Sequence, residues 1–286
     1  MTAPILVLGA HRSGTSVLNR VLGELGVFTG CRRDPNDEAW FFLRLNEWLL
    51  RQAGARWDQP APIDALLAHD TIRGLVVDYL RLSLDSPRSI SFLGLARFLR
   101  YRSVRRFDGP WGFKDPRSSF TLPLWLELFP AAKVLHIHRR GVDVAASLRA
   151  RERRHLERSM RRYPRLRVPL QVLPKRAGFT ASPRCSTLEG AFTLWECYVT
   201  EARQHVRRLG SQALELRYED LTADPGTVVE QVAASCELAP TTAQRARAAG
   251  LLRSERPRSS QEEAELAAFE RQVAERTVLT AAGEQA

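Results

Sequence analysis

Residues 4–16 read PILVLGAHRSGTS, and this stretch decides the fold. Its first five residues form an apolar run that predicts a buried strand, and the following VLNRVLGELGV repeats apolar residues at helical spacing. Between them, Gly9 and Gly14 have the spacing G-x-x-x-x-G of a phosphate-binding loop. Glycines let successive backbone N–H groups face one anion, and the start of the next helix adds partial positive charge. The stretch therefore predicts a strand, an anion-binding loop and a helix.

The loop lacks the lysine that a loop for ATP would carry directly after its second glycine. Thr15 occupies that position, and the nearest cation is Arg12, two residues before Gly14. We therefore expect the loop to bind an anion but to lack the lysine that ATP-hydrolysing enzymes use. A P-loop nucleotide kinase or NTPase is the alternative enzyme.

Strand and helix patterns alternate along the rest of the chain. Further strands are predicted at 111–114, 133–138 and 213–217. Helices are predicted at 38–53, 63–83, 119–128, 187–209, in the stretch after residue 138, and after the N-cap and proline pair Asp224-Pro225. This alternation indicates an α/β, P-loop-like three-layer fold with a central parallel sheet flanked by helices. No Gly/Ser-rich or Pro-rich linker divides the chain, so we expect a single domain over 1–286, with 254–286 as a C-terminal tail or helix.

Composition narrows the class of protein and its partners. Hydrophobic residues make up 44% of the 286 residues, enough for one sizeable core. The start of the chain has no basic region of a secretory signal, and no stretch reaches the roughly 20 apolar residues of a membrane span. Four scattered cysteines indicate a reducing compartment, so we expect a cytoplasmic protein. The net charge of +11 favours anionic partners, among them a phosphorylated nucleotide, an acidic glycan, nucleic acid, or a membrane surface in peripheral contact.

Basic residues gather in the segment 149–176, which holds eleven Arg and Lys against Glu152 and Glu157. One interpretation is a solvated helix and loop. The other is a lid over an anionic substrate, covering 149–185 and made partly irregular by its prolines, of which Pro164 is the first. Tyr163 is the segment's one aromatic residue, which disfavours binding of single-stranded nucleic acid by stacking.

The loop Arg12-Ser13-Gly14-Thr15-Ser16 resembles the 5′-phosphosulfate loop of sulfotransferases that use 3′-phosphoadenosine 5′-phosphosulfate (PAPS). Loops of that family carry Lys or Arg, then Ser-Gly-Thr-Thr/Ser. The resemblance implies that Arg12 contacts the phosphosulfate and stabilises charge on the leaving phosphate. It also implies that backbone N–H groups from Ser13 to Ser16, with the hydroxyls of Thr15 and Ser16, hold the phosphosulfate oxygens.

A second motif resembles the family's 3′-phosphate site, a strand that ends in Arg and a helix with Ser eight residues later. Arg139 and Ser147 fit this spacing after the strand VLHIH. The Arg guanidinium can form a bidentate hydrogen bond with a phosphate group. The chain departs from the family's frequent Arg-Asp-Pro, because Arg139 is followed by Arg140 and Gly141.

Two further pieces occur in the family's order, so the resemblance covers about residues 4–237. Lys114-Asp115-Pro116-Arg117 resembles the K-x-P-R turn of bacterial members, and Arg217-Tyr218-Glu219-Asp220-Leu221 resembles a segment whose tyrosine lies near the adenine. The resemblance therefore implies that Tyr218 binds the nucleotide.

Three residues are candidates for the base that takes a proton from the acceptor. Glu38 begins the helix predicted over 38–53, in a region where bacterial members often carry a catalytic glutamate. Asp115, next to Lys114, is the second candidate, and His11, inside the loop, is the third. The catalytic set is thus Arg12, Glu38, Lys114 and Asp115.

These observations indicate a sulfotransferase that moves a sulfuryl group from PAPS to a hydroxyl or amine of an acceptor, a carbohydrate or a small metabolite. No metal is required if arginine and backbone donors neutralise the charge of the transferred group. No nucleic-acid partner is expected. A basic nucleic-acid-binding protein is the alternative from another class, but it would leave the loop and the pair Arg139 and Ser147 unexplained.

Overall fold

In a computed structural model of the chain, the described residues are 2–175, 178–252 and 260–283. The chain forms two compact units. The first comprises 1–139 and 197–254, and the second comprises 140–196 and 255–286. The expectation of a single domain over 1–286 stays a prediction.

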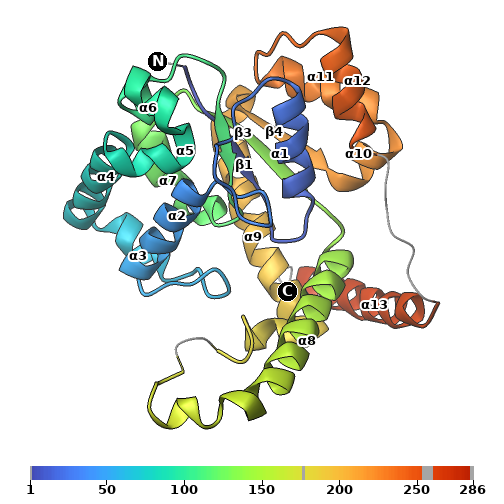
Figure 1. The fold of residues 1–286 in the computed structure, drawn as a ribbon. Helices are drawn as coiled ribbons and strands as arrows, with labels where there is room; N and C mark the ends of the chain where they lie inside the picture. Colours follow the sequence, from blue (N-terminus) through green and yellow to red (C-terminus); the bar gives the residue numbers. More distant parts are fainter. Residues whose placement is uncertain (1, 176–177, 253–259, 284–286) are drawn as a thin grey trace. The chain divides into compact units, whose positions relative to one another are not determined.

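A four-stranded parallel sheet organises the first unit (Figure 1). Its strands are β1 (Ile5–Leu8), β2 (Gly112–Lys114), β3 (Lys133–His138) and β4 (Ala213–Arg217), in the order β2-β1-β3-β4. Ile5 lies opposite Gly112 on one side and Lys133 on the other. All four strands therefore end at one edge, where the segments that carry the predicted site residues begin. The four predicted strands are confirmed.

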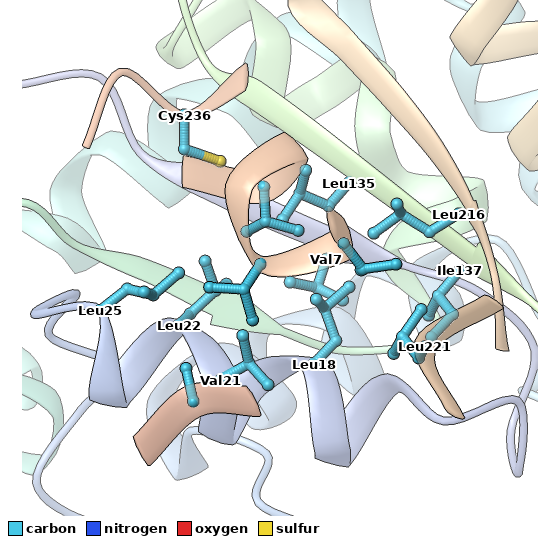
Figure 2. Close-up of a cluster of buried hydrophobic side chains, with 14 of the residues drawn as sticks. Val7, Leu18, Val21, Leu22, Leu25, Leu135, Ile137, Leu216, Leu221 and Cys236 are labelled. Carbon is cyan, nitrogen blue, oxygen red and sulfur yellow. The ribbon is translucent and has the colours of Figure 1, made fainter. Parts of the chain in front are cut away.

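One face of the sheet packs against helices from both ends of the first unit. These are α1 (Thr15–Glu24), α10 (Tyr218–Ala223), α11 (Pro225–Ser235) and α12 (Thr242–Gly250). Figure 2 shows their shared apolar cluster, in which Leu18 and Leu22 of α1 meet Val7 and Leu135 of the strands. The helix predicted after Asp224-Pro225 is confirmed, because the Asp224 carboxylate accepts the Thr227 N–H at the start of α11.

The opposite face carries the helices that lie after α1 and before β3 in the chain. They are α2 (Trp40–Gln52), α3 (Ile63–Ala68), α4 (Asp70–Leu84), α5 (Ile90–Leu93), α6 (Leu95–Tyr101) and α7 (Ser118–Leu128), with the 3₁₀ turns Pro87–Ser89 and Val104–Arg106. Phe42 of α2 stacks on Phe113 of β2 with ring centroids 3.8 Å apart, and Trp125 of α7 packs edge-on against both. Helices thus cover both faces, and the three-layer α/β fold is confirmed.

The helix predicted over 63–83 is wrong in one respect, because it is two helices. His69 adopts an extended backbone (φ −98°, ψ 98°) between α3 and α4, and its ring accepts the Ile72 N–H. A side chain that caps the next helix competes with a continuous helix through the same residue.

The second unit contains α8 (Gly141–Leu166), the first half of α9 (Leu188–Leu209), α13 (Ser260–Gly283) and the 3₁₀ turns Pro169–Gln171 and Pro183–Ser186. The rest of α9 and the 3₁₀ turn Gly210–Gln212 belong to the first unit. Ion pairs join α13 to α8: Glu270 lies 2.7 Å from Arg140, and Glu265 lies 2.6 Å from Arg149. The C-terminal segment is thus helical over 260–283, while 254–259 and 284–286 lie outside the described residues.

The basic segment is more regular than its prolines predicted. α8 continues through Pro164 to Leu166, so 149–166 is helix and not part of an irregular flap. Proline at position 164 cannot donate to the Met160 carbonyl, and α8 ends two residues later, at Leu166. Residues 176 and 177 of the predicted lid lie outside the described residues. Within the described ranges, no helix has both the length and the apolar character needed to cross a membrane.

Candidate functional site

The loop between β1 and α1 has the backbone of an anion-binding turn. Gly9 and Gly14 have φ of 144° and 96°, a region that favours glycine, and Arg12 is left-handed with φ of 74°. A Cβ at Gly9 would collide with the Ile137 carbonyl, and a Cβ at Gly14 would collide with the ring of Tyr218. Both glycines are therefore required by close approach as well as by φ.

The loop also offers unsatisfied donors in a confined place. Ser13 is fully buried, and its hydroxyl has no hydrogen-bond partner in the described chain. Thr15 is buried at the first position of α1, whose opening N–H groups have no partner inside the helix. Buried donors that protein atoms leave unpaired are costly, and an anion would satisfy them. The residues present therefore fit a bound phosphate or sulfate group.

The Asn36 carbonyl connects this loop to the end of β2. It accepts the Ser16 hydroxyl at 2.6 Å and the Lys114 ammonium, also at 2.6 Å. The structure thus brings together Ser16, in the loop, and Lys114, which lies 98 positions further along the chain.

Beyond Lys114 lies a buried cluster of alternating charges. Glu38 is 2% exposed, and its carboxylate lies 3.2 Å from the Lys114 ammonium and 3.1 Å from the Arg117 guanidinium. Arg117 in turn lies 2.9 Å from Asp115, which is fully buried. Buried charges persist when they are paired and hydrogen-bonded, as these are. Two of the three candidate bases, Glu38 and Asp115, thus share Arg117 as a partner.

Glu38 is the carboxyl of this cluster with a strongly shifted pKa. Burial, with a further contribution from Asp115, raises the pKa of Glu38 to about 7, although Lys114 and Arg117 act to lower it. Burial lowers the pKa of Arg117, but Asp115 and Glu38 outweigh it and hold that pKa above its usual value. A carboxyl that titrates near neutral pH is suited to take a proton from an acceptor.

Glu38 does not begin a helix, contrary to the sequence-based expectation. It lies two residues before α2, and its N–H donates to the Asp34 carboxylate at 2.8 Å. The Asp34 N–H donates back to the Glu38 carbonyl at 2.9 Å. This local turn aims Glu38 inward, toward the cluster, and not along the helix axis.

Asn46 and Tyr198 belong to the site and were not found by sequence reasoning. Asn46 is fully buried in α2 and donates to the Asp115 carboxylate at 3.0 Å and to the Ser118 hydroxyl at 3.1 Å. Burial raises the pKa of Tyr198, which sits close enough to Arg117, Asp115 and Glu38 for their charges to act on it. An amide on the apolar face of a predicted helix was the available signal for Asn46.

His11, the third candidate base, lies in an aromatic setting. Its ring packs edge-on against Trp57, with centroids 4.9 Å apart, and against Tyr198 at 5.7 Å. The Tyr198 hydroxyl donates to the Trp57 carbonyl at 2.8 Å, which ties this group together. His11 therefore lies next to Tyr198, whose hydroxyl is already used in the bond to Trp57.

Two residues predicted to bind the nucleotide, Arg139 and Tyr218, lie near Gly14, the second glycine of the loop. The guanidinium of Arg139 lies 4.6 Å from the centre of the Tyr218 ring, and that ring lies against Gly14. Arg139 is the last residue before the second unit, and Ser147 lies within α8 of the second unit. The pairing of Arg139 with Ser147 therefore stays a prediction.

Comparisons with known proteins identify the family. The model of the sulfotransferase family matches residues 4–242, and the chain belongs to that family. This confirms the resemblance seen in the motifs, and with it sulfuryl transfer as the class of reaction. No curated protein matches the chain.

The chain is also similar to solved structures of sulfotransferases, at low sequence identity. STF9 from Mycobacterium avium is 17% identical, with 88% of this chain and 68% of that chain covered and a TM-score of 0.44. The enzyme from Alicyclobacillus acidocaldarius is 17% identical, with coverages of 94% and 91% and a TM-score of 0.45. Mouse SULT7A1, complexed with PAP, is 12% identical with a TM-score of 0.46; 88% of this chain is covered, and it spans 64% of the mouse chain.

Proposed function

We propose that this protein transfers the sulfuryl group of PAPS to a hydroxyl or amine of a carbohydrate or small-metabolite acceptor in the cytoplasm. One observation carries the proposal: an anion-binding loop is hydrogen-bonded, through the Asn36 carbonyl, to a buried cluster that contains Glu38. A group held in the loop and a base with a pKa of about 7 are thereby linked in one site.

In this proposal, the loop and Arg139 hold the donor. The Ser13 hydroxyl, the N–H groups from Gly14 to Ser16 and the Thr15 hydroxyl bind the phosphosulfate, and exposed Arg12 reaches its oxygens. Ser16 contributes its N–H and not its hydroxyl, because that hydroxyl donates to the Asn36 carbonyl. Arg139 and Ser147 bind the 3′-phosphate, with Tyr218 next to the adenine. PAPS, when bound, supplies the sulfuryl group, and adenosine 3′,5′-bisphosphate leaves.

Glu38 is the proposed base, because its carboxyl is buried and its pKa lies near neutral pH. It takes the proton of the attacking hydroxyl or amine. Lys114 keeps one Glu38 oxygen in place, and Arg117 holds the other. Asp115 is a positioning residue in this proposal, because it lies 2.9 Å from Arg117, the residue that holds Glu38, and 3.0 Å from Asn46 of α2.

The cations around the loop replace a metal in this proposal. Arg12 lies within the loop, and Lys114 is bonded to the Asn36 carbonyl that the loop residue Ser16 also contacts. In-line transfer needs such positive charge around the transferred group. The described residues contain no group of three or more His, Cys, Asp or Glu side chains able to hold a metal ion. Metal independence itself stays a prediction.

A thermal-shift panel tests the proposal, with adenosine 3′,5′-bisphosphate, 5′-AMP, ATP and GTP as ligands. At 100 times its dissociation constant, the bisphosphate should stabilise the chain by about 2.7 kcal/mol. We expect 5′-AMP at the same concentration to do much less, because it lacks the 3′-phosphate, and Arg139→Ala to reduce the difference. Equal shifts for the bisphosphate and 5′-AMP would contradict the 3′-phosphate site, and a larger shift with ATP would favour a phosphotransferase.

A further inference from the structure

The outer half of α8 and the turn after it, residues 153–175, form a surface that the proposed chemistry does not use. We call this segment the basic surface. Leu156, Met160 and Tyr163 follow one another at helical spacing i, i+4, i+7 and so form one row along α8. All three are exposed, and Met160 is 65% exposed.

The apolar row continues beyond the end of the helix. Val168 is 74% exposed, Val172 is 84% exposed, and Leu173 is 65% exposed. Scattered single apolar residues on a surface are ordinary, but seven within 18 positions, Leu166 included, are not. These side chains remain in water unless a partner covers them.

Uncompensated positive charge accompanies this row. Near the base of α8, arginines are paired: Arg149 lies 2.6 Å from Glu265, and Arg151 lies 3.0 Å from Glu152. Further out, only Arg153 has an acidic neighbour, Glu157 at 3.9 Å. In the described part of the chain, six arginines of the basic surface have no acidic partner: Arg154, Arg158, Arg161, Arg162, Arg165 and Arg167.

The chain after the basic surface anchors it to α8. The buried carboxylate of Glu152 accepts the N–H groups of Ala181 and Ser182 at 2.9 and 3.1 Å. Phe179 packs edge-on against Tyr163 with ring centroids 5.2 Å apart. These contacts fix the described residues after the basic surface against α8, and the basic surface presents both apolar and cationic side chains.

We propose that the basic surface binds the face of a lipid bilayer that contains anionic lipids. A helix with arginines on one face and exposed apolar side chains on another is suited to lie in the interface plane, where the apolar atoms enter the acyl boundary and the guanidiniums meet phosphates. Nucleic acid would engage the charge but would leave Met160, Val168 and Val172 in water. An acidic protein would have to combine an apolar groove with acidic side chains in matching positions, whereas a bilayer with anionic lipids presents apolar atoms and negative charge along its whole face.

Flotation of the full chain with vesicles tests this proposal, and it needs no acceptor or sulfuryl donor. The vesicles are pure phosphatidylcholine, or phosphatidylcholine with about 30 mol% phosphatidylglycerol as the anionic lipid. The charge variant carries Gln at Arg154, Arg158, Arg161 and Arg162. The apolar variant carries Met160→Gln and Val172→Gln. A control variant loses the same charge elsewhere, with Gln at Arg100, Arg102, Arg207 and Arg208, all exposed in the first unit.

We expect binding to anionic vesicles and little binding to phosphatidylcholine alone. Each arginine near an anionic surface contributes about a fivefold factor, so the charge variant should bind at least about 100-fold more weakly. The apolar variant should also bind more weakly, by about tenfold or more, because two side chains no longer enter the acyl boundary. The control variant should bind like the natural chain.

Three outcomes would overturn the proposal. If the control variant loses as much affinity as the charge variant, the attraction is a property of net charge and not of this surface. If the apolar variant binds as well as the natural chain, the exposed row does not enter the membrane. If single-stranded DNA, added as competitor, displaces the protein from vesicles through the same arginines at lower concentration than the lipid requires, the surface is a nucleic-acid site. Circular dichroism of each variant establishes that α8 is still folded.

Discussion

Glu38→Gln keeps the size of a buried side chain while removing its ability to exchange a proton. In the folded protein the pKa of Glu38 is about 7, against an ordinary value of 4.5. The folded chain therefore holds a proton on Glu38 over a pH range in which the unfolded chain has released it. The stabilising effect is fully present below about pH 4.5 and is lost as the pH rises through 7.

The size of this effect follows from the two pKa values. The full difference between 4.5 and about 7 corresponds to about 3 kcal/mol, and most of it falls between pH 5 and pH 8. The glutamine variant lacks this dependence, while every other titrating group is common to both proteins. The stability of the natural chain relative to Glu38→Gln should therefore fall by about 2 to 3 kcal/mol from pH 5 to pH 8.

Urea unfolding of the first unit, followed by tryptophan fluorescence at both pH values, measures this difference. Glu47→Gln is the matched control, because Glu47 also lies near Arg117, at 3.7 Å, but is partly exposed. Its stability relative to the natural chain should change little with pH. A difference for Glu38→Gln that stays within about 0.5 kcal/mol between pH 5 and pH 8 would refute the raised pKa.

The same variant tests the catalytic role. With Glu38 as the base, release of adenosine 3′,5′-bisphosphate from PAPS, measured over a panel of sugar and phenol acceptors, should rise from acid pH and level off above about pH 7. Glu38→Gln should lower turnover by about 10²- to 10⁴-fold. Turnover that survives in Glu38→Gln but is lost in a His11→Ala variant would move the role of base to His11.

Three further predictions concern the donor site. Arg139→Ala should raise the Michaelis constant for PAPS. Arg12→Ala should mainly lower turnover, by raising the barrier roughly 3 kcal/mol, because charge develops on the leaving phosphate. An Arg12→Ala variant changed only in its Michaelis constant would contradict that role. Saturating EDTA should leave sulfuryl transfer nearly intact, and loss of activity with rescue by Mg²⁺ would argue for a metal. Gly14→Ala should abolish binding of the bisphosphate in calorimetry, because a Cβ there would collide with the Tyr218 ring and because Gly14 has a φ of 96°. The control Gly23→Ala lies in α1 where a Cβ meets no atom, so it should bind normally and add about 0.5–1 kcal/mol of stability.

The sequence by itself was sufficient for the strands, most helices and the anion-binding loop. These features depend on neighbours in the chain. Apolar runs such as Ile5–Leu8 indicate a buried strand, and Gly9 and Gly14 at a spacing of five indicate the turn after it. The break at His69 escaped this reasoning because the apolar spacing runs through it, and only the capping bond to Ile72 reveals the end of one helix and the start of the next.

The tertiary structure alone decided which charged side chains meet. Glu38 pairs with Lys114 and Arg117 because β2 lies next to β1 in the sheet, which places the end of β2 beside the segment after the loop. No local pattern encodes that neighbour relation between strands. The pKa of about 7 for Glu38 is a tertiary property for the same reason, since it depends on burial under side chains distant in sequence and on Asp115. The sequence provides the carboxyl of Glu38, and its burial in the folded chain raises the pKa that makes Glu38 a candidate base.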